Sequence, residues 1–319
     1  MVDPIRWSGV LRGAAILTLV FASGCATPPS PASDQARLRM LRAELIARGD
    51  PDALATAAVF EGLATGHWND APDLAARATA AAPDRADLAY LQLLLCYQMP
   101  SCKAEPLETH LRELDPTNGI TWIYALGRAT RANDSAAANV AFAGLAQARR
   151  VDLYWTALVS HMTAMVAGRA GFDESGAFVY VVGVDAAMVL PPLQPISTTC
   201  SAAAVANPDV LAQCRRIVAA LEHADTILIE SYGNHRAARL WPDGSAESVA
   251  IASERRVLDY RMNLWVEQRR ALNSRKATRT FAGLLGHYST EQEAFLALCV
   301  DLGLQADPPA DWQQPQPHG

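Results

Sequence analysis

Residues 115–148 read DPTNGITWIYALGRATRANDSAAANVAFAGLAQA, and this stretch decides the fold that the sequence predicts. Helix-breaking residues open it at DPTN, residues 115–118, and divide it at RAND, residues 131–134. Between these breaks the apolar residues recur every three or four positions, which is typical of amphipathic helices. The stretch therefore predicts two helices joined by a short turn and packed against each other in antiparallel directions.

Similar breaks recur along the first half of the chain at a nearly constant spacing. Pro51, Pro83 and Pro116 are 32 and 33 residues apart, and Trp122 and Trp155 are 33 residues apart. A period of about 34 residues with two helices in each unit is the pattern of a helical repeat protein. The sequence in this half resembles the tetratricopeptide repeat.

The resemblance is strongest in the quoted unit. The family's unit opens with a Pro-x-Asn turn, a Trp follows the proline by 6 residues, and a small residue and an aromatic follow the Trp by 16 and 20. The positions that match this pattern are Pro116, Asn118, Trp122, Ala138 and Phe142. The resemblance implies that the tryptophan fills the gap between the two helices, that the alanine lets them approach closely, and that the second aromatic packs against the next unit. Trp155 is the corresponding tryptophan of the following unit.

The repeat-like part covers residues 36–168, and the rest of the chain predicts further helices. These helices are expected at residues 175–189, 208–232, 246–274 and 290–303. The β-like run FVYVVGV, residues 178–184, continues into further apolar residues, which favours a buried helix. We therefore expect an all-α fold with repeated helix pairs, a C-terminal helical section over residues 169–304, and a mobile proline-rich tail over residues 305–319.

The N-terminus carries the pattern of an export signal. Residues 13–24, GAAILTLVFASG, form an apolar run that is too short for a membrane-spanning helix, which needs about 20 residues. Arg6 and Arg12 precede the run, and small residues end it, as in a removable signal peptide.

Residues 22–25, Ala-Ser-Gly-Cys, resemble the lipobox of bacterial lipoproteins. The resemblance implies that residues 1–24 are removed, that Cys25 is acylated with chains such as palmitate, and that Ala26 directs the protein to the periplasmic face of the outer membrane. The proline-rich residues 25–35 are then an extended tether. An ordinary secretory signal and a short uncleaved anchor are the alternatives.

Five of the six cysteines remain after Cys25 is assigned to lipid. Cys96 and Cys102 form one candidate disulfide, and Cys200 and Cys214 form a second, although connectivity cannot be deduced from sequence. The remaining cysteine, at position 299, lies in an apolar run and reads as a small buried residue. Without a C-x2-C pair, we expect no metal site from these cysteines.

Composition and motifs point away from several functions. The chain is 50% hydrophobic and 19% charged, so a sizeable core is available, and its net charge of −6 with no basic block disfavours nucleic acid as a partner. No catalytic motif is present, and no cofactor is expected. The one notable polar cluster contains Glu230, Ser231, Tyr232, Asn234, His235 and Arg236. It reads more simply as a helix end with Gly233 as its C-terminal stop.

Two functional hypotheses follow. In the first, the protein is a lipid-anchored scaffold whose stacked helices bind another protein of the cell envelope during envelope assembly or maintenance, since such stacks form extended binding surfaces. In the second, it is a lipid-tethered periplasmic enzyme with a site near residues 230–236. The oligomeric state stays open.

Overall fold

The computed structural model describes residues 31–99, 102–186, 188, 190–201, 204–272 and 274–314. Over this part of the chain the protein is all-α, as the sequence predicts, and its helices are connected by short turns. None of the helices within these ranges is both long enough and apolar enough to cross a membrane. The predicted signal peptide, Cys25 and the tether up to residue 30 lie outside the described residues.

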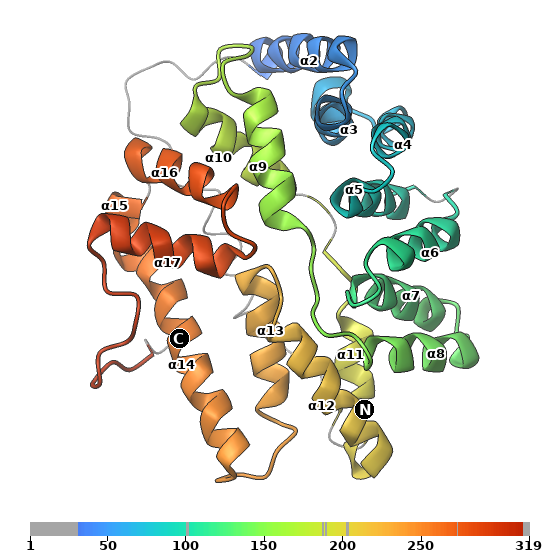
Figure 1. Ribbon diagram of the computed structural model, residues 1–319, viewed down its shortest axis with the longest axis vertical. Coiled ribbons are helices and arrows are strands. Elements are labelled where there is room, and N and C mark those ends of the chain that lie inside the picture. The colour runs from blue at the N-terminus through green and yellow to red at the C-terminus, as the bar shows by residue number, and fades with distance from the viewer. Residues whose placement is uncertain are drawn as a thin grey trace.

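The first seven helices of the described residues follow one another along one side of the molecule (Figure 1). They are α2 (Pro31–Arg48), α3 (Pro51–Thr65), α4 (Ala71–Ala81), α5 (Ala86–Tyr97), α6 (Ala104–Leu114), α7 (Ile120–Arg131) and α8 (Ser135–Leu145). Each packs against the next in the chain, so the predicted helix pairs are present. The first of the described helices, α2, begins at residue 31, five residues before the predicted start at residue 36.

The local sequence explains why the helices of the quoted unit begin and end where they do. Asn133 adopts a left-handed backbone conformation with φ 55° and ends the turn after α7. The side chain of Asp134 then accepts a hydrogen bond of 2.9 Å from the backbone N–H of Ala137, which caps the N-terminus of α8.

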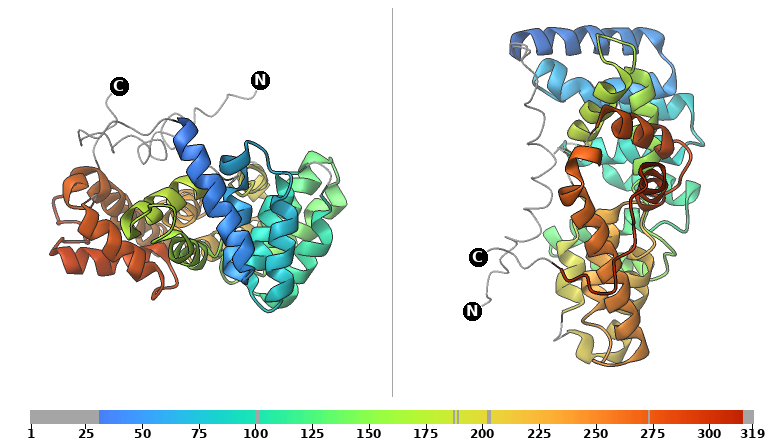
Figure 2. Two further views of the ribbon diagram at one scale, coloured as in Figure 1. Left: turned by 90° about the horizontal axis from the view of Figure 1, so that it is seen from above. Right: turned by 90° about the vertical axis from the view of Figure 1, so that its left-hand side faces the viewer.

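The second section contains nine further α-helices and one short 3-10 helix among the described residues. They are α9 (Trp155–Val166), α10 (Glu174–Asp185), α11 (Gln194–Thr199), η2 (Ala204–Ala206), α12 (Pro208–Leu221), α13 (Ile227–Ala237), α14 (Ala246–Glu267), α15 (Arg269–Leu272), α16 (Arg275–Leu285) and α17 (Glu291–Leu302). Viewed from above, α9 and α10 lie between the α2–α8 stack and helices α14–α17 (Figure 2).

Most helix predictions in this section are confirmed. The helix predicted over residues 246–274 is divided at residue 268 into α14 and α15. Residues 178–184 lie within α10, so the β-like run is helical. The single helix predicted over residues 208–232 is instead two helices, α12 and α13, separated by residues 222–226. The tail expected to be mobile lies along α14 over residues 305–314.

One hydrophobic core runs through both sections. Its buried members include Leu41 and Phe60 from the first helices, Leu158 from α9, and Phe281 and Phe295 from α16 and α17. Because this cluster contains residues from both sides of residue 168, the two halves of the chain pack against each other.

The residues predicted to pack the repeat lie at helix contacts. The Trp122 indole lies across Gly144 of α8, and Arg112 of α6 places its guanidinium 4.5 Å from the Trp122 ring centroid. Phe142 is buried and Ala138 is half-buried. Pro116 precedes α7, and Trp155 is the first residue of α9.

Both candidate cysteine pairs lie at disulfide distance. The Cα atoms of Cys96 and Cys102 are 5.3 Å apart, and those of Cys200 and Cys214 are 5.7 Å apart. The first pair joins the end of α5 to the chain just before α6. The second joins the end of α11 to α12. Cys299 is unpaired and fully buried in α17.

The packing of Trp122 over Gly144 predicts how a methyl group added at position 144 changes stability. A Cβ atom at Gly144 would lie 2.5 Å from the Trp122 ring, whereas a Cβ at Gly283 of α16 would meet nothing within 4 Å. We expect Gly144→Ala to lower the free energy of unfolding by about 1–3 kcal/mol through overpacking. Gly283→Ala should raise it by up to about 1 kcal/mol through helix propensity. Urea unfolding measures both, and equal effects of the two variants would contradict the packing described here.

Candidate functional site

Helix α9 leaves the stack, and this departure shapes the candidate site. Helices α3, α5, α7 and α9 begin at residues 51, 86, 120 and 155, so the sequence period continues into α9. By this period α9 would be the next helix to stack after α8. It packs instead against α3, α5, α10 and α16, on the inner side of the stack (Figure 1).

The connection before α9 is fixed to the turn before α7. Asn118, which is buried, accepts from the backbone N–H of Asp152 at 2.9 Å and donates to the carbonyl of Asp152 at 2.8 Å. Arg150 forms a two-pronged ion pair with Asp115, at 2.7 Å and 3.3 Å. The asparagine of the Pro-x-Asn motif therefore binds the chain one repeat further on.

Asp225 fixes the start of α9 from the opposite section. Its two carboxylate oxygens accept from the backbone N–H groups of Leu153 at 2.8 Å and of Trp155 at 2.7 Å. Burial and the neighbouring Asp152 carboxylate raise the pKa of Asp225 well above its usual range, although the two backbone donors oppose this shift. The N-terminus of α9 is thus capped by a residue that lies 70 positions later in the chain.

A polar cluster holds the middle of α9 against the stack. His161 of α9 has its Nδ1 atom 3.5 Å from the Asp87 carboxylate and 2.9 Å from the Arg85 guanidinium. Arg85 also pairs with Asp52 at 3.0 Å. Although burial of the Asp87 carboxylate opposes the shift, the bonds from Arg85 and His161 hold the pKa of Asp87 well below its usual range. These contacts dock α9 onto the N-termini of α3 and α5.

The outer side of α8 is exposed and uncharged. We call this surface the α8 face, and its exposed residues are Ser135, Ala136, Ala137, Asn139, Val140 and Ala143. Val140 is 65% exposed. In the equivalent second helices of the earlier pairs, exposed positions carry charges, with Asp73 and Arg77 on α4 and Glu105 and Glu113 on α6.

An open groove of about 540 Å³ lies between the end of α8 and α12. We call it the α8–α12 groove, and its lining residues are Ala146, Gln147, Ala148, Arg149, Arg216, Ala219, Ala220 and His223. One bond across it joins the Arg216 side chain to the carbonyl of Ala146 at 3.1 Å. The lining combines alanines with cationic side chains and contains no carboxylate, so the groove favours an apolar surface that carries negative charge.

The residues of the alternative enzyme site point to different neighbours. In α13, Glu230 accepts from the Gln292 side chain of α17 at 2.9 Å, whereas Tyr232 bonds to Ser197 of α11 at 2.8 Å. His235 is exposed and bonds at 3.0 Å to the backbone carbonyl of Ser231.

The rest of this cluster is part of the α13 packing. Asn234 is buried, and the Arg236 guanidinium lies 5.6 Å from the Tyr232 ring centroid. Gly233 lies inside α13 and not at its end, so its prediction as a helix stop is wrong. A Cβ there would come within 2.7 Å of Leu221, so this glycine allows α12 and α13 to approach closely.

Three carboxyl groups with raised pKa values come from α10, α13 and α17. Burial raises the pKa of Asp185 to about 6, against the Trp155 indole N–H that donates to it at 2.8 Å. Burial also raises the pKa of Glu291 to about 7, against the backbone N–H of Ile227, and that of Glu230 to about 7, against Gln292. Among the described residues, no group of His, Cys, Asp and Glu side chains has the arrangement of a metal site.

Comparisons with protein families, with curated proteins and with solved structures found nothing that matches this chain.

The raised pKa values predict that the protein loses stability as the pH rises from about 5 to about 8. Unfolded carboxyl groups titrate near pH 4, so the folded protein binds more protons than the unfolded chain above that pH. The stabilisation is complete below about pH 4. It is lost as the pH passes through the folded pKa values of about 6 and about 7. Urea unfolding across this range measures the effect.

Glu291→Gln provides the test of this linkage. In the wild type the Ile227 N–H lies 2.9 Å from the Glu291 carboxylate. The amide of the variant keeps an oxygen that accepts from this N–H, but it cannot ionise. We expect a smaller loss of stability between pH 5 and pH 8 than in the wild type. Glu293→Gln, on the exposed side of the same helix, should keep the wild-type pH dependence. A Glu291→Gln variant with unchanged pH dependence would show that this carboxyl does not titrate as described.

Proposed function

We propose that this chain is a bacterial lipoprotein, anchored by Cys25 at the periplasmic face of the outer membrane, whose stacked helices bind another protein of the cell envelope. The proposed role is that of a scaffold in envelope assembly or maintenance. The observation that carries the proposal is the uncharged α8 face beside the cationic α8–α12 groove.

The two ends of the helix stack differ in a way that supports this role. A stack of helix pairs stays soluble when its terminal helices present polar outer surfaces. Helix α2 carries exposed charges at Arg39, Glu44 and Arg48, beside an exposed Met40. The α8 face has no exposed charge, and Val140 is among the most exposed large apolar side chains of the described residues. Exposed apolar surface bordered by polar residues is typical of a protein interaction site.

Charge and shape define the partner segment that fits. Helix α8 lacks the following helix that the sequence period provides, so its exposed face has the dimensions of a helix-packing surface. Arg149, Arg216 and His223 line the adjoining groove. The complementary partner is therefore a helix with small apolar residues on one side and acidic residues beside them.

The proposed anchor would place this surface away from the membrane. Pro31, where α2 begins, follows Cys25 by six positions, and a fully extended chain of this length reaches about 20 Å. The α2 end of the stack would therefore lie close to the lipid, and the α8 end lies at the opposite end of the stack (Figure 1).

Lipidation of Cys25 is tested by metabolic labelling with palmitate. We expect the wild-type chain to incorporate label and to partition with membranes, and Cys25→Ala to lose both properties. Cys299→Ala is the control, because Cys299 is a buried cysteine of α17 and not a lipid acceptor in this proposal. Label that persists in Cys25→Ala would contradict the anchor.

Protein binding at the α8 face is tested by photo-crosslinking in living cells. A photoreactive amino acid at Val140, 65% exposed, is compared with the same amino acid at Val300 of α17, 79% exposed. We expect one envelope protein to be captured from position 140 and not from position 300, and to be lost when Arg149 and Arg216 are both replaced by Glu. Equal capture from both positions, or capture that survives the charge reversal, would contradict the proposal.

A further inference from the structure

The C-terminal tail packs on α14 as an extended segment. After α17 the chain turns back at Gly303, and the backbone N–H of Leu304 bonds to the carbonyl of Cys299 at 2.8 Å. From there to residue 308 exposed and half-buried residues alternate, with Leu304, Ala306 and Pro308 half-buried. A period of two residues is that of an extended chain with one side against a surface.

Side chains of α14 hold this segment mainly by hydrogen bonds to the segment's backbone carbonyls. The Arg256 guanidinium donates to the carbonyls of Pro309, Ala310 and Trp312, the last two at 3.1 Å and 3.2 Å. One turn further on, the Tyr260 hydroxyl donates to the carbonyl of Gln305 at 3.2 Å. Arg261 adds a bond to the carbonyl of Ala306 at 3.3 Å. Backbone carbonyls are common to every sequence, so these contacts accept any extended segment of suitable shape.

Two side-chain contacts add selectivity. The Arg261 guanidinium pairs with the Asp307 carboxylate at 3.1 Å. The Trp312 ring stands edge-on to the Tyr260 ring, with centroids 5.3 Å apart and an interplanar angle of 81°. The recognised pattern is therefore an acidic residue, two prolines that favour extension, and a tryptophan 5 positions after the acid.

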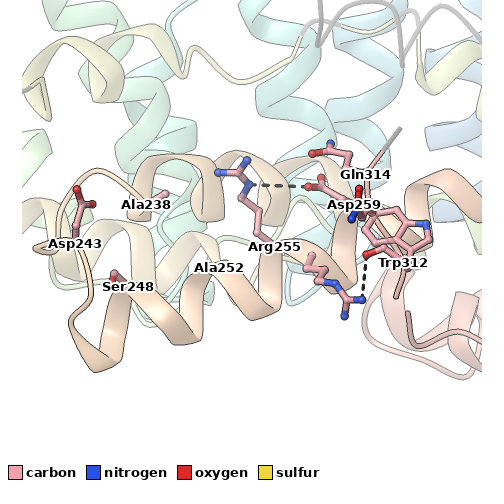
Figure 3. Close-up of a pocket in the computed structure, with 10 residues that line it drawn as sticks. Ala238, Asp243, Ser248, Ala252, Arg255, Asp259, Trp312 and Gln314 are labelled. Carbon is pink, nitrogen blue, oxygen red and sulfur yellow. Dashed lines mark hydrogen bonds and ion pairs between the residues drawn. The ribbon is translucent and has the colours of Figure 1, made fainter. Parts of the chain in front are cut away.

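The groove beside the tail continues along α14. It has a volume of about 560 Å³ and reaches from Trp312 past Arg255 and Ala252 to Ser248 and Asp243 (Figure 3). The tail residues between 303 and 314 are all exposed or half-buried, so no deeply buried side chain fixes them. Segments held by solvent-exposed bonds open locally at low cost.

We propose that this surface of α14 is a recognition site for extended, proline-rich segments of a partner protein, and that the chain's own tail is its resident ligand. A partner segment with the acid–Pro-Pro–Trp pattern displaces the tail and gains the same contacts. The site is separate from the α8 face, so this inference stands or falls independently of the proposed function.

The test uses the full-length chain and a fluorescent synthetic peptide of residues 304–314, LQADPPADWQQ. The tethered tail competes with the peptide at an effective concentration in the millimolar range. A chain carrying Asp307→Ala and Trp312→Ala, which weaken the resident tail, should therefore bind the peptide at least about tenfold more tightly than the wild type. Fluorescence anisotropy measures the binding.

Variants of α14 identify the site. In the tail-weakened chain, Arg256→Ala should abolish peptide binding, and Tyr260→Phe, which removes only the hydroxyl bonded to Gln305, should weaken it several-fold. Arg279→Ala is the control, since Arg279 of α16 pairs with Glu174 of α10 at 3.1 Å, does not line the groove and should leave binding unchanged. Absence of peptide binding to the tail-weakened chain at millimolar peptide, or binding that Arg256→Ala does not reduce, would overturn the proposal.

The wild-type chain gives a second readout that needs no variant. Excess unlabelled peptide should shift the indole N–H NMR signal of Trp312, whose ring packs edge-on against Tyr260, toward its position in the free peptide. An unchanged Trp312 signal at saturating peptide would overturn the proposal. A wild-type dimer that the tail variants convert to a monomer would assign the site to tail exchange between two copies, and would overturn the assignment to a partner protein.

Discussion

The carboxylate of Asp225 connects three segments that lie far apart in the sequence. Its side chain binds the backbone at Leu153 and Trp155, and its own backbone bonds to Val151 and Glu291. The start of α9, the turn before α13 and the start of α17 therefore meet at one residue. A buried carboxylate is stable only when its acceptors are filled, so these segments must assemble together.

This constraint explains why α9 does not continue the series of helices α2–α8. The sequence period extends to α9, and repeat packing alone would stack that helix on α8. The cap from Asp225 and the polar cluster around His161 stabilise a different position, inside the stack. Helix α9 then packs against α3 and α5 on the inner side of the α2–α8 series. The same displacement leaves the α8 face exposed. The surface of the stack that α9 leaves uncovered is therefore at its α8 end and not on its inner side.

The sequence predicted those features that depend on local residues. Helix pairs followed from breaks at Pro51, Pro83 and Pro116. What it did not predict depends on contacts between distant residues. The break at residues 222–226 contains neither Gly nor Pro, and its role as the cap of another helix has no signature in a single sequence. Gly233 looked like a helix stop because its close contact with Leu221 is visible only in three dimensions.

With the proposed lipid anchor, the membrane would also prevent an unwanted assembly. An exposed helix face at one end of a stack can pair with the first helix of another copy, and such head-to-tail contacts extend without limit. All anchored copies share one orientation, and α2 would be held within about 20 Å of the lipid by the short tether. The α8 end of a neighbouring copy could not reach the outer side of α2 from that direction. The exposed charges of Arg39, Glu44 and Arg48 act against the same contact, because they would have to be desolvated. The α8 face would then remain available to a partner that approaches from the periplasm.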